Sequence, residues 1–234
     1  MPDLYILTGS YGAGKSTTGH FYLPEHIRDK YEIFDGDKLF MQKRKQIYKI
    51  ETPSLKEAER RTREWLYEEF EDRVAKAIKN NDNFIYEGHF PEEENWVTPK
   101  RFKIAGYKIN FIFLGLSHPG ISEQRVLHRA KKGGHNVPPY EIERNFYGNL
   151  QQLNKHYHLI DELQIIDTSG SRTSKILAIF SNGKVIDALQ VKDMPDWFES
   201  RLPDLFQLVY NKKNPLAFED NEIQKLSLFY FFSK

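Results

Sequence analysis

The sequence contains no cysteine, and this absence excludes disulfide bonds, thiolate metal sites and a cysteine nucleophile together. It also has no run of the roughly 20 apolar residues that a membrane-spanning helix needs. The mean hydropathy is −0.65. No basic and then apolar leader precedes the first predicted strand. We therefore expect a cytoplasmic protein with no segment in a membrane.

An excess of charge of one sign is missing as well. Lysine and arginine number 34 and aspartate and glutamate 33, so the formal net charge is +1. A chain without a net field does not select polyanions such as nucleic acids, and its electrostatic recognition must be local. Hydrophobic residues make up only 39%, but 17 Phe, 13 Tyr and 3 Trp supply large apolar surfaces. A chain of 234 residues with these aromatics can bury one sizeable core.

Short apolar runs typical of buried strands alternate with helical segments in the first part of the chain. The predicted strands cover residues 4–8, 31–34, 84–86, 109–114 and 163–166. The predicted helices run from a capping box at Ser54 to about Ile78, within 91–105, over 121–132 and over 139–157. This alternation indicates an α/β protein with a mostly parallel five-stranded sheet and helices on both faces.

The pattern changes near residue 170. Asn182 and Gly183 separate two apolar runs, and Asn-Gly between such runs is a strong signal for a β-hairpin. Beyond residue 195, helical patches alternate with proline and end in an apolar cluster. We therefore predict a core of residues 1–170 and an extension of residues 171–234, in which a small hairpin and helices pack on the core.

A phosphate-binding loop is the most specific motif in the chain. Residues 9–17 read GSYGAGKST and match the pattern GxxxxGKS/T, after a predicted strand and before a helix-compatible segment. Glycines let backbone N–H groups wrap around a phosphate, Lys15 reaches the β- and γ-phosphate oxygens, and the Ser16 hydroxyl ligates Mg²⁺. We therefore predict a P-loop NTPase fold that binds ATP and Mg²⁺. The predicted nucleotide-binding residues are Gly9, Ser10, Tyr11, Gly12, Ala13, Gly14, Lys15, Ser16 and Thr17.

Missing motifs narrow the class of nucleotide-binding protein. No Asn-Lys-x-Asp guanine-reading motif occurs, because other residues follow Asn154-Lys155 and Asn211-Lys212. The chain is also too short for a motor ATPase with a helical second domain. A small kinase with an acceptor site and a mobile lid is the class that remains.

Three carboxylates follow predicted strands. Asp35 and Asp37 come just after the run at 31–34, and Glu87 follows the run at 84–86. Ligands bind at the carboxyl ends of the strands of an open parallel sheet, so these acids are predicted to contact the acceptor, and Asp37 can meet its hydroxyl. Glu87 also suits a contact with a Mg²⁺-bound water. The alternatives are that Asp37 caps the next helix and that Glu87 is a solvated turn residue.

Three arginines suit a lid. Arg125 and Arg129 are one helical turn apart, and Arg144 lies on a returning helix after a break rich in Gly and Pro. Guanidinium groups neutralise charge on phosphate oxygens when a closing segment brings them in. We therefore predict a helical lid at about 121–157 whose arginines, with Lys15, take part in catalysis. The alternative is that the arginines are solvated on amphipathic helices.

These segments resemble the zeta-toxin-like P-loop kinases, which are more distantly related to gluconate and nucleotide kinases. The resemblance covers residues 1 to about 190. It rests on LYILTGSYGAGKST at the start, on DGDKL, on the glutamate that closes the third strand, and on RVLHRAKKGGHNVP followed by IERNFYGNL. Two positions differ from the family pattern. Asn145 stands where many members have a second arginine, and Gly88-His89-Phe90-Pro91 replaces a segment rich in Ser and Thr.

The resemblance implies an ATP-dependent kinase whose acceptor is a hydroxyl group. Lys15 and Ser16 would then bind ATP and Mg²⁺, and the three lid arginines would bind phosphates. Asp37 would be the base and Glu87 would contact the acceptor. Zeta toxins phosphorylate a UDP-linked N-acetyl amino sugar, so a nucleotide sugar such as UDP-N-acetylglucosamine is one candidate acceptor.

Two other hypotheses stay open at this point. A nucleoside or polynucleotide kinase would use the basic run between Lys38 and Lys49 to follow phosphates. A nucleotide-gated regulatory or interaction module would bind ATP without efficient turnover. In that case the apolar C-terminal segment offers a surface for an antitoxin-like protein partner or for self-association.

Overall fold

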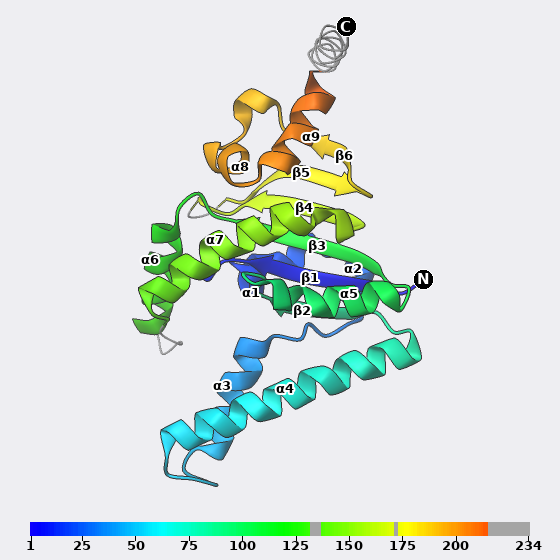
Figure 1. Ribbon diagram of the computed structural model, residues 1–234. Helices are drawn as coiled ribbons and strands as arrows, with labels where there is room; N and C mark the ends of the chain where they lie inside the picture. The colour runs from blue at the N-terminus through cyan, green and yellow to red at the C-terminus, as the bar shows by residue number, and fades with distance from the viewer. Residues whose placement is uncertain (132–136, 171–172, 215–234) are drawn as a thin grey trace, which may run out of the picture.

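The computed structural model describes residues 1–131, 137–170 and 173–214 of the chain. Its centre is a six-stranded sheet in the order β2-β1-β3-β4-β5-β6 (Figure 1). The strands are β1 (Asp3–Gly9), β2 (Phe84–Gly88), β3 (Lys108–Gly115), β4 (Glu162–Asp167), β5 (Lys175–Ser181) and β6 (Lys184–Ala188). The first four in this order run parallel, and β5 and β6 are antiparallel to their neighbours. The predicted α/β fold class with a mostly parallel sheet is confirmed.

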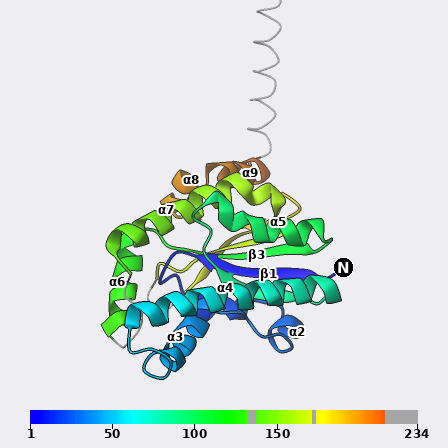
Figure 2. The same cartoon turned by 60° about the horizontal axis from the view of Figure 1, so that its bottom comes forward.

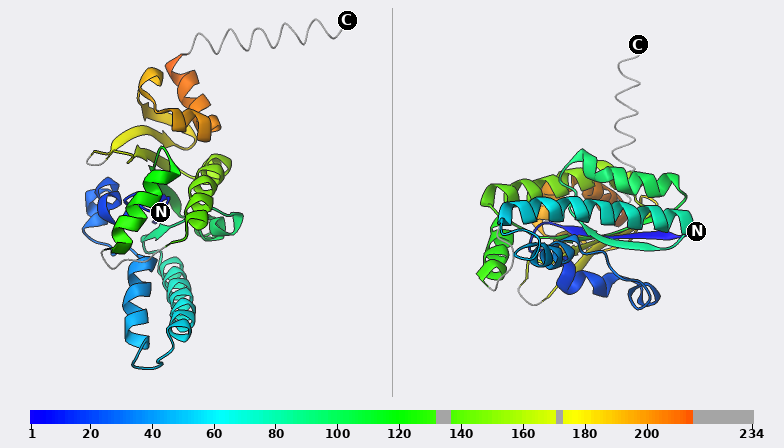
Figure 3. Two further views of the ribbon diagram at one scale, coloured as in Figure 1. Left: turned by 90° about the vertical axis from the view of Figure 1, so that its left-hand side faces the viewer. Right: turned by 90° about the horizontal axis from the view of Figure 1, so that it is seen from below.

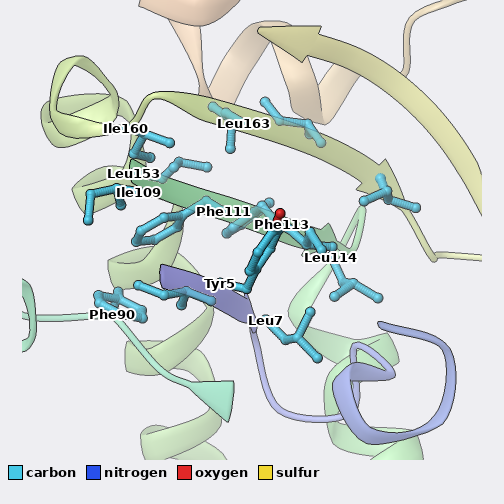
Figure 4. Close-up of a cluster of buried hydrophobic side chains, with 14 of the residues drawn as sticks. Tyr5, Leu7, Phe90, Ile109, Phe111, Phe113, Leu114, Leu153, Ile160 and Leu163 are labelled. Atoms are coloured by element: carbon cyan, nitrogen blue, oxygen red, sulfur yellow. The ribbon is translucent and has the colours of Figure 1, made fainter. Parts of the chain in front are cut away.

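The central strands β1 and β3 are buried on both faces. Their near-continuous apolar runs, LYIL and INFIFL, are typical of parallel strands that helices cover from both sides. Figure 4 shows Phe111 and Phe113 of β3 among apolar side chains from other segments, including Phe90 and Leu153. The phosphate loop therefore leaves the sheet from one of its most buried strands.

Helices cover both faces of the sheet, with α5 and α7 on one face and α1 and α2 on the other (Figures 2 and 3). The α-helices are α1 (Lys15–Thr18), α2 (Glu25–Arg28), α3 (Gly36–Ile47), α4 (Leu55–Asn80), α5 (Val97–Ile104), α6 (Pro119–Lys131), α7 (Pro139–His156), α8 (Asp196–Arg201) and α9 (Pro203–Lys213). The 3-10 turns are η1 (Gly19–Tyr22), η2 (Glu93–Trp96), η3 (Tyr157–Leu159) and η4 (Val191–Asp193). The helices predicted at 121–132 and 139–157 correspond to α6 and α7.

Helices α3 and α4 form an arm that extends beyond the edge strand β2 (Figures 1 and 3). The predicted cap of α4 is present, because the Ser54 hydroxyl accepts a hydrogen bond from the N–H of Glu57 at 3.3 Å. The second half of α4 packs on β2, where the ring of Phe70 contacts those of Phe84 and Tyr86. The arm therefore has one end anchored on the sheet.

The strand predicted at 31–34 is wrong. Only Phe34 pairs with β2, by accepting a hydrogen bond from the N–H of Glu87 and donating one to the carbonyl oxygen of Ile85, both at 2.9 Å. Asp35 then caps α3, so the chain leaves the sheet after a single bridge. The parallel part of the sheet has four strands instead of five, and the hairpin supplies the other two.

The hairpin forms where the sequence predicts it, with left-handed φ angles of 47° at Asn182 and 73° at Gly183. It continues the sheet, because β5 pairs with β4. Helices α8 and α9 follow it, and Trp197 of α8 packs against the backbone of Gly115 at the end of β3. The apolar segment at 215–234 lies outside the described residues. Within the described part of the chain, no helix is both long and apolar enough to span a bilayer.

Candidate active site

The phosphate loop joins β1 to α1 and depends on glycines with left-handed backbone angles. The φ values are 141° at Gly9, 71° at Gly12 and 95° at Gly14. A Cβ atom at Gly9 would lie 2.2 Å from the carbonyl oxygen of Leu114 in β3, so a larger residue does not fit there. Such a backbone is what a loop needs in order to wrap an anion.

Lys15 begins α1, and its ammonium group turns back over the loop. Nζ donates hydrogen bonds to the carbonyl oxygens of Gly9 at 3.1 Å and Ser10 at 3.2 Å. Burial lowers the pKa of Lys15 to about 8, and the charges of Glu87 and Asp37 oppose this shift. A partly desolvated cation on the loop is placed to bind phosphate oxygens.

Ser16 and Glu87 meet beside the loop. The Ser16 hydroxyl donates a hydrogen bond to Oε2 of Glu87 at 2.7 Å. Since β1 and β2 are neighbours in the sheet, the end of β2 lies next to the start of α1. Burial raises the pKa of Glu87 to about 7, and the charge of Asp35 acts in the same direction while the Ser16 hydrogen bond opposes it. Glu87 therefore lies beside the phosphate loop and is not a solvated turn residue.

The two aspartates after Phe34 have different positions. Asp35 is the N-cap of α3, and its Oδ1 accepts a hydrogen bond from the N–H of Lys38 at 3.0 Å. Asp37 lies in the first turn of α3 and lines a cavity. The alternative that Asp37 caps the helix is wrong, because Asp35 already fills that role. Among the described residues the Asp37 side chain has no hydrogen-bond or ion-pair partner, which leaves its carboxylate available for other chemistry.

A first cavity of about 440 Å³ opens between the phosphate loop, the α3–α4 arm and the ends of α6 and α7. Its charged and polar lining combines carboxylates with cations. The lining residues are Tyr11, Ser16, Asp35, Gly36, Asp37, Lys38, Phe40, Met41, Arg63, Leu66, Arg129, Val137 and Glu141. The predicted acceptor-binding aspartates therefore share one cavity with Ser16 of the predicted nucleotide site.

A second cavity of about 650 Å³ also borders the phosphate loop. Backbone and small side chains of the loop and of α1 form one wall, and α6 with the segment after β4 forms the other. The lining residues are Gly12, Ala13, Gly14, Thr17, Thr18, Arg125, His128, Thr168, Gly170, Thr173 and Ser174. The two cavities share no lining residue. Of the residues predicted to bind nucleotide, Tyr11 and Ser16 line the first cavity, and Gly12, Ala13, Gly14 and Thr17 line the second.

The three predicted lid arginines have three different environments. The Arg125 guanidinium donates to four backbone carbonyl oxygens, those of Gly12, Thr168, Ser169 and Gly170, at 2.8 to 3.3 Å. Arg129 lines the first cavity. Arg144 lines neither cavity and forms an ion pair with Glu92 at 2.8 Å. The break between α6 and α7 lies mostly outside the described residues, at 132–136.

Several residues near the site were not predicted from the sequence to be site residues. Arg63 reaches the first cavity from α4, which the alternation of strands and helices does not place near the loop. Asn145 is buried in α7 and accepts a hydrogen bond from the N–H of Tyr11. The His89 ring packs on that of Tyr11 in a tilted arrangement with ring centroids 4.4 Å apart, and burial holds the pKa of His89 well below the ordinary value. The sequence offers one clue to Asn145: together with Asn149, four residues later, it interrupts the otherwise apolar buried face of α7.

The comparisons with known proteins agree with these features. The zeta toxin family model matches residues 1–177. The solved structure of the PezAT chromosomal toxin–antitoxin system of Streptococcus pneumoniae is similar, with a TM-score of 0.56 and 17% identity over 100% of this chain and 88% of that chain. No match was found among the curated proteins.

A second similar structure is the complex of AvrRxo1-ORF1 with AvrRxo1-ORF2. Its TM-score is 0.63 at 14% identity, and the match covers 86% of this chain and 64% of that chain. The same complex with ATP has the same values. At these identities the likeness shows a shared fold, and the family match identifies the class of enzyme. The prediction of an ATP-dependent P-loop kinase is confirmed, and the chain belongs to the zeta toxin family.

Proposed function

We propose that the chain transfers the γ-phosphoryl group of Mg²⁺-bound ATP to a hydroxyl group of an anionic small molecule. The observation that carries this proposal is that two cavities with no lining residue in common both border the phosphate loop. Phosphoryl transfer requires donor and acceptor to lie in line with the transferred group between them. ATP would occupy the second cavity with its phosphates on the loop, and the acceptor would occupy the first.

The donor set beside the loop fits Mg²⁺. Ser16 offers a hydroxyl and Glu87 a carboxylate, and these are hard oxygen ligands held 2.7 Å apart. A Mg²⁺ ion bound there would neutralise charge on the phosphate oxygens. Lys15 supplies a second positive charge on the same side of the loop. Ser16 lines the first cavity, and Glu87 beside it would contact the acceptor directly or through water.

Asp37 is the proposed base. It lines the first cavity together with Ser16, and its backbone position in α3 leaves the capping of that helix to Asp35. A carboxylate facing the acceptor can take the proton of the hydroxyl that attacks the phosphorus. Arg129, which lines the same cavity, is the proposed cation for the charge that develops during transfer.

Of the six charged side chains that line the first cavity, Asp35, Asp37 and Glu141 are carboxylates and the other three are cations, which would bind the phosphates of an anionic acceptor. Lys38, Arg63 and Arg129 line it, and none of them forms an ion pair with a carboxylate within the described part of the chain. Phe40 and Tyr11 add aromatic surface beside these cations. A nucleotide sugar such as UDP-N-acetylglucosamine has this combination of phosphates, hydroxyls and a planar base, and it is our first candidate acceptor.

A polynucleotide acceptor receives less support. Arg44 in the basic run forms an ion pair with Glu59 of α4 at 3.0 Å. Lys43 lies over the ring of Trp65, 5.1 Å from its centroid. These contacts hold the arm together and leave fewer cations to follow a phosphate backbone.

The family also supports a proposal about a protein partner. One similar structure is described as a toxin–antitoxin system, and another is a complex of two proteins. We propose an antitoxin-like partner for this chain as well. Co-expression with each neighbouring gene product, followed by size-exclusion chromatography, tests this: a stable complex supports it, and separate elution of every pair contradicts it.

The experiment for the proposed activity is a phosphorylation screen with γ-labelled ATP against anionic hydroxyl metabolites, nucleotide sugars included. We expect label transfer by the wild-type chain and its loss in Lys15→Ala. Lys43→Ala is the matched control, because it removes a lysine that lines neither cavity. Equal transfer by a folded Lys15→Ala variant and by wild type would contradict the assignment.

A further inference from the structure

Two asparagines of α7 connect the loops that carry the two halves of the candidate site. Asn145 and Asn149 are one helical turn apart and are 4% and 1% exposed. Oδ1 of Asn145 accepts a hydrogen bond from the backbone N–H of Tyr11 at 3.2 Å. Oδ1 of Asn149 accepts one from the backbone N–H of Phe90 at 2.7 Å. Tyr11 belongs to the phosphate loop, and Phe90 belongs to the segment that follows Glu87.

The Asn149 side chain is also bonded to the backbone of Asn145. Nδ2 of Asn149 donates a hydrogen bond to the backbone carbonyl oxygen of Asn145 at 2.5 Å. Asparagine is an unfavourable residue in a helix interior, and a buried amide is costly unless it is hydrogen-bonded. In α7 the N–H groups of Tyr11 and Phe90 donate to the buried side-chain amides. The side-chain oxygens in turn give those two backbone donors an acceptor. The two asparagines therefore stabilise the positions of the two loops more than they stabilise α7 itself.

The close approach of α7 to the segment after β2 is a second, independent observation. Gly148 lies between the two asparagines in sequence, and a Cβ atom there would be 2.6 Å from the carbonyl oxygen of Pro91 and 2.7 Å from its Cβ. Only glycine allows the helix to lie this near. On the other side, the Ser122 hydroxyl of α6 donates to the carbonyl oxygen of Tyr11. The Tyr11 residue is thus held from both α6 and α7.

We propose that Asn145 and Asn149 are positioning residues of the phosphoryl-transfer site, an inference that rests on the proposed function. They touch neither cavity and act through the backbone. By holding Tyr11 and Phe90 on one helix, they set the spacing between the phosphate loop and Glu87. A displacement of about 1 Å between reacting groups can cost about 100-fold in rate. The pair therefore governs turnover more than it governs ATP affinity.

The test compares kcat at saturating ATP and the Kd of a non-hydrolysable ATP analogue. We expect Asn149→Ala to lower kcat by about 10- to 100-fold while Kd changes by less than about threefold. Asn149→Asp keeps the oxygen that accepts from Phe90 but loses the Nδ2 donor to the Asn145 carbonyl oxygen and buries a carboxylate, so it should recover only part of the loss. Asn145→Ala and Asn145→Asp form the corresponding pair for Tyr11.

Asn154→Ala is the matched control on the same helix. Oδ1 of Asn154 accepts from the N–H of Asp204 at 3.1 Å and its Nδ2 donates to that carboxylate at 2.9 Å, far from both loops in sequence. This variant loses comparable hydrogen bonds but should keep the wild-type kcat. Equal kcat values for Asn149→Ala, Asn145→Ala and Asn154→Ala, each measured on folded protein, would overturn the proposal.

Amide hydrogen exchange of the nucleotide-free protein separates this proposal from the proposed function. We expect the amides of Tyr11 in Asn145→Ala and of Phe90 in Asn149→Ala to exchange at least about tenfold faster than in wild type, because each loses its acceptor. In Asn154→Ala both should keep their rates. If the wild-type chain transfers no phosphoryl group, the proposed function fails. In that case the exchange rates still test whether Asn145 and Asn149 hold Tyr11 and Phe90. Unchanged rates in the alanine variants would contradict this role.

Discussion

The hydroxyl of Ser16 in α1 donates a 2.7 Å hydrogen bond to the carboxylate of Glu87 at the end of β2. Ser16 follows the phosphate loop in sequence, whereas Glu87 belongs to β2 and is separated from it by the whole α3–α4 arm. The pairing of β1 with β2 brings them together at the carboxyl ends of the strands, where an open parallel sheet binds its ligands. Ser16 and Glu87, the two proposed Mg²⁺ ligands, therefore lie together at the edge of the sheet where Glu87 would also contact the acceptor.

Glu87 should make the stability of the protein depend on pH. Burial raises its pKa from an ordinary 4.5 to about 7, so the native state binds a proton more tightly than the unfolded state. This contribution is fully present below about pH 4.5 and is lost as the pH rises through about 7. Glu87→Gln removes it, so the unfolding free energy of the variant relative to wild type should rise by about 1 to 3 kcal/mol across this range.

Urea unfolding of wild type and Glu87→Gln at about pH 4.5 and about pH 7.5 measures this difference. The control is Glu94→Gln, which changes an exposed glutamate of η2. A difference between Glu87→Gln and wild type that stays constant with pH would show that burial does not perturb this carboxylate.

Arg125 should contribute more to stability than Arg144. The Arg125 guanidinium ties four backbone carbonyl oxygens of the phosphate loop and the segment after β4, so Arg125→Ala leaves those acceptors without a donor. We expect a loss of about 1 to 3 kcal/mol. The ion pair of Arg144 with Glu92 is 68% and 41% exposed, and Arg144→Ala should cost at most about 1 kcal/mol. Chemical denaturation of both variants provides the comparison, and the reverse order would be inconsistent with the observed contacts.

The packing of the C-terminal extension on the core is testable at Gly115. A Cβ atom there would lie 2.3 Å from Cη2 of Trp197, so Gly115→Ala forces α8 away from β3 and should destabilise the protein by about 1 to 3 kcal/mol. Gly36→Ala is the matched control, because its Cβ would meet its nearest neighbour at 3.7 Å. Thermal unfolding of both variants tests this, and equal melting temperatures would mean that α8 does not pack on the core.

Local signals allowed much of the fold to be predicted from the sequence. The phosphate loop, the cap at Ser54 and the Asn182-Gly183 turn each depend on residues within a few positions of one another. The strand at 31–34 was wrong because apolar residues alone do not show where a chain leaves a sheet. There the cap at Asp35 starts α3 after one bridge.

The rest of the site depends on contacts between distant segments. Asn145 and Tyr11 are 134 positions apart, and Asn149 and Phe90 are 59 apart. Arg63 reaches the first cavity only because α4 folds back along α3. The spacing of residues on one helix cannot reveal such partners, and the same limit applies to Arg125, whose backbone acceptors come from three loop positions after β4 and from the phosphate loop.

The measurement that tests the account most directly is single-turnover transfer of labelled phosphate from ATP to the acceptor found in the screen, by wild type, Asp37→Asn and Asp35→Asn. A base contributes about 10² to 10⁴ in rate, so Asp37→Asn should slow transfer by that factor and leave the Kd of ATP nearly unchanged. Asp35→Asn should do much less, because an asparagine can still accept the hydrogen bond from the N–H of Lys38 and cap α3. Transfer that is slowed more by Asp35→Asn than by Asp37→Asn would contradict the assignment of the base.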